Sequence, residues 1–192
     1  MVNKKILERR RKLLATLIFS IKLNLLVIPL YILIYLDFSL PSLQNFLAYL
    51  ISLTLSSLKF PVTSEGKNIF IFLTESESYR IIPFEISMDC TGWKSMYLLT
   101  ALVFASSFEL KKNLKFLAIT LPFLFIINFL RIVSTIAIAL IFGFEFFEVT
   151  HNILWREGMV FIVVIIWYLW LRKIKYKLKD NLNLVERLVR TF

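Results

Sequence analysis

The sequence predicts an all-α polytopic membrane protein with about four spanning helices, an interfacial helix and a small outer β-hairpin-like loop. The first observation behind this prediction is composition, since 58% of the 192 residues are hydrophobic and 19 are Phe. A soluble domain of this length has too little interior to bury so much apolar surface. The second observation is that basic residues flank the apolar runs, as they do in multi-pass proteins of a cell membrane.

Four apolar segments approach the roughly 20 residues that a spanning helix needs. They cover about 13–36, 91–108, 116–141 and 153–171. The first follows a basic start, but it is too long for a signal-peptide core and has no small-x-small cleavage site, so we expect an uncleaved anchor. No repeat or second domain is evident, and residues 1–192 are expected to form a single integral membrane domain.

The distribution of charge predicts the orientation of these helices. Segments 1–12, 109–115 and 172–192 together hold 16 Lys and Arg against 4 Asp and Glu, whereas 37–89 and 143–152 hold 3 against 8. The positive-inside rule then places the first set in the cytoplasm and the second set outside, which requires four crossings. The net charge of +10 is therefore attributed to anchoring at anionic lipid and not to nucleic acid binding.

The outer region 37–89 is expected to contain two kinds of structure. Its stretch 42–58 is apolar but interrupted by Ser, Thr, Asn and Gln. A fifth crossing there would force a basic segment outside, so we expect an interfacial or re-entrant helix. The pieces 68–73 and 80–87 are rich in Ile and Phe and are separated by a polar turn, a pattern that predicts a short β-hairpin.

Three residues that could carry chemistry fall near the outer ends of the predicted helices. Cys90, the only cysteine, opens the second span, where a helix N-terminus favours the thiolate. Arg131 lies about fifteen residues into a helix that enters from the cytoplasm, so it rises roughly 22 Å through a core of about 30 Å. His151, the only histidine, precedes the last span. A single Cys and a single His exclude an internal disulfide and argue against a metal centre, and no cofactor is expected.

Each of these residues also has a structural explanation. The cysteine could serve packing, the histidine could lie at the interface, and Arg131 could extend to outer headgroups or pair with Glu148. The functional hypothesis makes Cys90 a nucleophile, His151 its acid and base, and Arg131 a donor to a developing oxyanion. Asn128, three residues before Arg131 on the same helix face, could orient it or the substrate.

Taken together, these residues resemble the signature blocks of the exosortase/archaeosortase family over roughly residues 40–165. The blocks are Cys90-Thr91-Gly92 with Ser95, Asn128-x-x-Arg131-Ile132, and His151 with Gly158 seven residues later. The resemblance implies a polytopic transpeptidase, analogous to sortases, that processes a C-terminal tripartite signal of secreted proteins: a short motif, a hydrophobic helix and a basic tail. It also implies Cys90, Arg131 and His151 as catalytic residues, with Asn128, Gly92 and Ser95 in supporting positions.

Two departures from the family pattern are visible. Asp89 stands where the family usually has a small residue, and an anion there disfavours the thiolate unless Arg131 or Lys94 offsets it. The chain is also short for the family and has fewer spanning helices than many members.

Three functions therefore remain open from the sequence. The first is a transpeptidase or cysteine protease that works at the outer face of the cell membrane and transfers secreted proteins to an acceptor such as a lipid. The second is a cysteine acyltransferase that moves lipid acyl groups. The third is a non-enzymatic assembly or transport subunit in which Arg131 is a structural charge.

Overall fold

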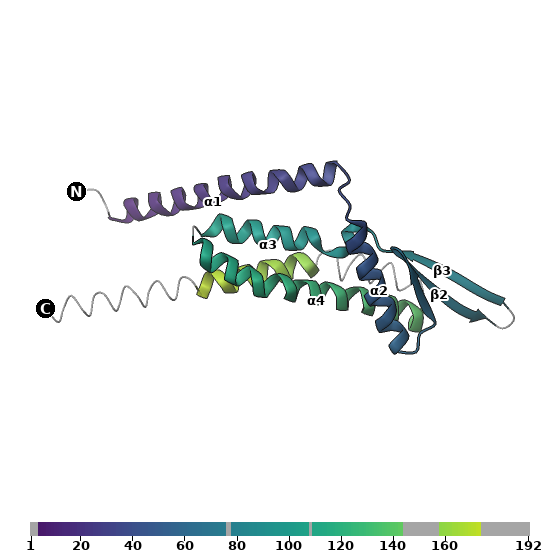
Figure 1. The fold of residues 1–192 in the computed structure, drawn as a ribbon. Coiled ribbons are helices and arrows are strands. Elements are labelled where there is room, and N and C mark those ends of the chain that lie inside the picture. Colours follow the sequence, from purple (N-terminus) through teal and green to yellow (C-terminus); the bar gives the residue numbers. More distant parts are fainter. Residues whose placement is uncertain (1–3, 76–77, 108, 144–157, 174–192) are drawn as a thin grey trace.

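The computed structural model describes residues 4–75, 78–107, 109–143 and 158–173. Figure 1 shows a long bundle whose helices run side by side, with a crossing helix and a small sheet gathered at one end. The start of the first helix and the end of the last helical segment lie at the opposite end. The bundle consists of α1 (Lys4–Tyr35), α3 (Trp93–Ser106), α4 (Leu110–Phe142) and a helical segment at 158–173, and the crossing helix is α2 (Pro41–Ser57).

Helices occur at all four apolar segments, but only two described helices are long and apolar enough to cross a membrane by themselves. These are Leu13–Tyr35 within α1 and Leu110–Phe142, which is α4. With 14 residues, α3 extends only about 21 Å, short of a hydrocarbon core of about 30 Å. The predicted broad class, a mostly helical membrane protein, is confirmed. The four membrane crossings stay a prediction.

The connection between α3 and α4 differs from expectation. The sequence predicted a loop over 109–115, whereas α4 begins at Leu110 and includes its three lysines. The turn is short because side chains close it: the Ser107 hydroxyl accepts from the Glu109 N–H at 3.1 Å, and the Asn113 amide donates to the Ser107 carbonyl at 3.1 Å. Lysine is a good helix former, so the helix extends through the basic stretch.

The predicted hairpin is confirmed. Strands β2 (Asn68–Glu75) and β3 (Ser78–Glu85) pair antiparallel. A third strand that the sequence analysis did not predict, β1 (Val62–Glu65), completes a sheet of order β1-β2-β3. It joins β2 through a two-residue loop that starts with Gly66 at φ +57°, and a glycine in this place suits a type II′ hairpin turn.

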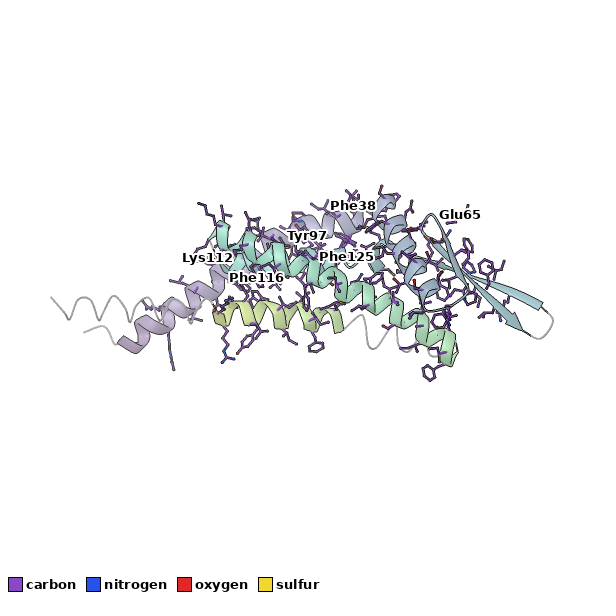
Figure 2. All side chains as sticks on the ribbon, turned by 60° about the horizontal axis from the view of Figure 1, so that its bottom comes forward. Phe38, Glu65, Tyr97, Lys112, Phe116 and Phe125 are labelled. Carbon is purple, nitrogen blue, oxygen red and sulfur yellow. The ribbon has the colours of Figure 1, made fainter. Side chains whose placement is uncertain are left out.

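Two hydrophobic cores divide the molecule, and α4 contributes to both. The cap core joins α2, the sheet and the C-terminal half of α4, where Ile132, Val133 and Ile136 are buried. The bundle core joins α3, the first half of α4, segment 158–173 and part of α1. Figure 2 shows the side chains between these elements, with Phe116 and Phe125 on successive parts of α4. The candidate reactive residues lie where the two cores meet.

α1 packs along α3 on one face and leaves its other faces exposed. Phe19 stacks on Trp167 with ring centroids 5.8 Å apart, and the Tyr97 hydroxyl donates to the Leu26 carbonyl at 2.9 Å. Most other large apolar side chains of α1 are exposed. Such a surface suits contact with lipid, where exposed apolar side chains carry no hydration cost.

Candidate active site

Cys90 lies in a short 3-10 helix, η1 (Met88–Thr91), between the end of β3 and the start of α3. The chain that leads into η1 is held on both sides. The Ile86 N–H donates to the Lys67 carbonyl at 2.9 Å, and the buried Gln44 amide of α2 donates to the Ile86 carbonyl at 2.8 Å. Helix α2 and the sheet, which together form the cap (residues 41–86), therefore determine where the cysteine enters the bundle.

Asn128 of α4 links the cysteine backbone to Arg131. Its amide nitrogen donates to the Cys90 carbonyl at 2.7 Å, and its amide oxygen accepts from Arg131 Nη1 at 3.3 Å. The Asn128 side chain is fully buried, while its two partners are partly exposed. Removing a hydrogen-bond partner from a buried polar group costs about 1–3 kcal/mol.

Gly92 makes the approach of Asn128 possible. It has a left-handed backbone with φ +77°, and it forms the junction between η1 and α3. A Cβ atom added at this position would lie 2.8 Å from Cγ of Asn128. Gly92 was expected to permit a close approach, and the group that approaches it is the Asn128 side chain.

Arg131 and Cys90 line the same small pocket, which has a volume of about 50 Å³. No carboxylate within the described ranges forms an ion pair with Arg131, so most of its donors are available to a substrate oxygen. The remaining wall is mainly apolar: Phe84, Glu85, Ile86, Ile132, Thr135 and Ile136.

The thiol has a hydrogen-bond donor that the sequence analysis missed. The Ser87 hydroxyl donates to Cys90 Sγ at 3.2 Å, and the Cys90 N–H donates to the Ser87 carbonyl at 3.1 Å. The backbone bond is the one that defines a 3-10 turn, and the turn brings the two side chains within reach of each other. The only signal in the sequence was a serine three residues before the cysteine. That spacing brings the hydroxyl to the sulfur only when the 3-10 turn forms.

The acid beside the cysteine is paired with a base. Lys94 Nζ lies 2.7 Å from Asp89 Oδ1, so the lysine that the sequence analysis named as a possible counter-charge forms the ion pair. The Asp89 side chain is 68% exposed, which means that solvent also screens its charge. The departure from the family pattern at this position is thus locally compensated.

A second and larger hollow of about 370 Å³ is lined by Ser87. Its walls come from the C-terminal end of α1, the 37–39 turn, the start of α2, the end of β3, η1 and the start of α3. The polar groups on these walls are mostly acids, amides and hydroxyls: Asp37, Ser39, Gln44, Glu85, Ser87, Asp89 and Lys94. Glu85 lines both spaces, the small apolar pocket that contains Arg131 and the wider polar hollow.

The structure brings together four of the six residues singled out from the sequence: Cys90, Gly92, Asn128 and Arg131. Ser95 lies on the first turn of α3, where its N–H donates to the Gly92 carbonyl, and it lines neither hollow. His151 and Glu148 lie outside the described residues. Within the described parts of the chain, no group of three or more His, Cys, Asp and Glu side chains could hold a metal ion.

The chain also matches a known protein family over most of its length. The family model described as transmembrane exosortase matches residues 8–173. The chain belongs to the exosortase family. The match extends beyond the 40–165 region in which the motifs were recognised and includes α1 and segment 158–173. Searches of curated proteins and of solved structures give no significant match. Membership of the exosortase family supports a membrane location for this protein.

Proposed function

We propose that this exosortase-family protein is a membrane cysteine transpeptidase that cleaves the C-terminal hydrophobic sorting signal of secreted proteins. The observation that carries the proposal is the common pocket of Cys90 and Arg131, together with the Asn128 side chain that holds both. A nucleophile and a fixed cation beside one small space are the two groups that acyl transfer needs at a carbonyl.

In the proposed first step, the Cys90 thiolate attacks the carbonyl carbon of the scissile peptide bond. The electron pair of the carbonyl moves to oxygen, and Arg131 donates hydrogen bonds to that oxyanion. Its guanidinium suits the role because its donors are fixed in a plane and stay charged. The tetrahedral intermediate then collapses, the C–N bond breaks, and a thioester forms on Cys90.

His151 is proposed to take the thiol proton and to return it to the leaving amine. This assignment comes from the family resemblance and from the single histidine of the chain. In the second step an acceptor nucleophile attacks the thioester, loses its proton to His151 and regenerates the thiol. We propose a lipid acceptor and place this chemistry at the outer face, since the charge distribution predicts an outer position for the cap.

The test is co-expression with a secreted protein that ends in a short motif, an apolar helix and a basic tail. We expect loss of the tail in the presence of the parent enzyme and its retention with Cys90→Ala, as judged by intact mass of the secreted protein. Cys90→Ser should retain little activity, because an alkoxide forms far less readily than a thiolate near neutral pH. Full processing by Cys90→Ala would remove the nucleophile assignment.

The mass of a trapped thioester separates this function from the alternatives. A peptide adduct on Cys90 supports a transpeptidase, and a fatty acyl adduct would support a membrane acyltransferase. If neither adduct forms and Cys90→Ala remains functional in the cell, a non-enzymatic subunit becomes the better explanation.

A further inference from the structure

Ser87 forms the only hydrogen bond to the Cys90 thiol that is found among the described residues. Its hydroxyl oxygen is 3.2 Å from Sγ, a short distance for a hydrogen bond to sulfur. Ser87 is also the residue that precedes η1 as its N-cap, with an extended backbone of φ −66° and ψ 160°.

A serine in this position usually binds a free backbone N–H of the helix that it caps. Ser87 makes no such bond, and its hydroxyl lies against the sulfur instead. The capping requirement therefore does not explain the orientation of the side chain, whereas stabilisation of a thiolate does. A hydroxyl hydrogen bond to an ionised acceptor is roughly twice as strong as one to a neutral acceptor.

We propose that Ser87 is a catalytic residue that donates its hydroxyl hydrogen to the Cys90 thiolate and increases the fraction of the reactive form. The inference rests on the proposed role of Cys90 as nucleophile. The thiol proton leaves to His151 or to solvent, while Ser87 keeps its own proton and shares it with the sulfur. Once the sulfur lone pair forms the thioester bond, the sulfur accepts only weakly and the hydrogen bond loses most of its strength.

The effect on rate has two opposing parts. If the hydrogen bond favours the thiolate about tenfold, the reactive fraction at low pH is about tenfold larger than without the bond. A more stable thiolate is also a weaker nucleophile, with a Brønsted coefficient of about 0.4–0.5, so each thiolate reacts roughly threefold more slowly. The net gain in reaction rate is roughly threefold at low pH. At high pH, where all the thiol is ionised, the hydrogen bond instead lowers the rate.

This reversal is the test, and the chain allows it because Cys90 is the only cysteine. The full-length protein in detergent is mixed with dithiodipyridine, a small uncharged disulfide, and the second-order rate is measured over a wide pH range. Ser87→Ala should react about threefold more slowly than the parent at low pH and about threefold faster at high pH, so the two profiles cross. Ser87→Thr keeps the hydroxyl and should follow the parent.

Ser39→Ala is the matched control, since Ser39 lines the same larger hollow and forms no hydrogen bond to the thiol. It should give the parental profile. A change in the accessibility of the thiol alone would change the rate by the same factor at every pH. Such parallel profiles for Ser87→Ala, or an unchanged profile, would overturn the inference.

A second variant decides the matter if Ser87→Ala does not fold to a monodisperse protein. Aspartate is an equally good N-cap residue, but Ser87→Asp replaces the donor by an anion. An anion disfavours the neighbouring thiolate, so the rate of Ser87→Asp at low pH should fall below the parental rate. A parental profile would be inconsistent with the proposed role of Ser87. The assay needs no protein substrate, so crossing profiles together with unprocessed substrate would refute the transpeptidase and leave the role of Ser87 intact.

Discussion

The side-chain amide of Asn128 donates a 2.7 Å hydrogen bond to the Cys90 carbonyl, across 38 residues of sequence. This bond joins the short helix that carries the thiol to the long helix that carries Arg131. Because Asn128 also accepts from the guanidinium, its side chain sets the relative position of the two groups. Its loss should therefore affect reaction geometry more than overall folding.

Substitution at Asn128 tests this relationship. Asn128→Leu removes both hydrogen bonds and should lower the free energy of unfolding by about 1–3 kcal/mol while abolishing processing. Asn128→Asp keeps an acceptor for Arg131 but has no donor for the Cys90 carbonyl, so processing should fall strongly in this variant as well. Thermal unfolding in detergent and the fraction of processed substrate are the two measurements.

Asn113 provides the control, since it is also fully buried on α4 but lies at the other end of the helix. Asn113→Leu should cost stability through the lost bond to Ser107 and leave processing per folded molecule unchanged. Equal losses of processing for the two asparagine variants would mean that Asn128 acts only through stability.

Substitution of Arg131 separates an oxyanion donor from a structural charge. Arg131→Lys keeps the charge but presents it as a point and not as a plane of donors, so processing should fall by about 10²–10³-fold. Arg131→Leu should insert at least as well as the parent, because it removes a cost of about 2.5–3.5 kcal/mol for a charge within the membrane, and it should also be inactive. Processed substrate is normalised to the amount of inserted enzyme. Near-parental turnover in both variants would reduce Arg131 to a structural charge.

Gly92→Ala should destabilise the protein by more than its backbone strain alone. The left-handed backbone costs an alanine about 1–2 kcal/mol, and the added Cβ would also displace Asn128. Gly158 has no positive φ and nothing within 4 Å of an added Cβ, so Gly158→Ala is the control without strain or clash. The melting temperature of Gly92→Ala should lie well below that of Gly158→Ala, and a loss no larger than the strain alone would argue against the tight contact.

The ion pair of Asp89 and Lys94 should have a small and salt-dependent effect on the thiol. Lys94→Gln leaves the acid beside Cys90 unpaired, and the rate of disulfide exchange near neutral pH should fall by about twofold to threefold. Adding Asp89→Asn to this variant should restore the rate. The difference should shrink at 1 M salt, where the Debye length is about 3 Å. A difference that persists at high salt would indicate a structural cause.

The orientation can be tested with single cysteines in a Cys90→Ala background. Lys67 lies in the cap and Lys112 on the first turn of α4, and both side chains are about half exposed. A cysteine at Lys67 should react with a membrane-impermeant reagent in intact cells, and a cysteine at Lys112 only after permeabilisation. The reverse pattern would invert the topology and place the reactive site in the cytoplasm.

The helices and the hairpin were predictable because each has a periodic or continuous apolar pattern. The strand β1 was not, since it has four residues and only Val62 among them is buried. The three-residue spacing of Asn128 and Arg131 follows from helix geometry, and the structure places the two in contact. The contacts of Cys90 with Ser87 and Asn128 depend on a 3-10 turn and on a left-handed glycine, and neither can be read from an apolar pattern.

The division into a cap core and a bundle core has a consequence for how the family can diversify. The cap, residues 41–86, contacts the reacting groups through its edges, while Asn128 and Arg131 belong to a helix of the bundle. Exchange of the cap between related proteins could therefore alter which peptides are accepted without rebuilding the chemistry. Such chimeras would need to conserve the contacts of α2 with η1 and the complementary surface of α4, formed by Phe125, Phe129, Ile132, Val133, Ile136, Ala137 and Leu140.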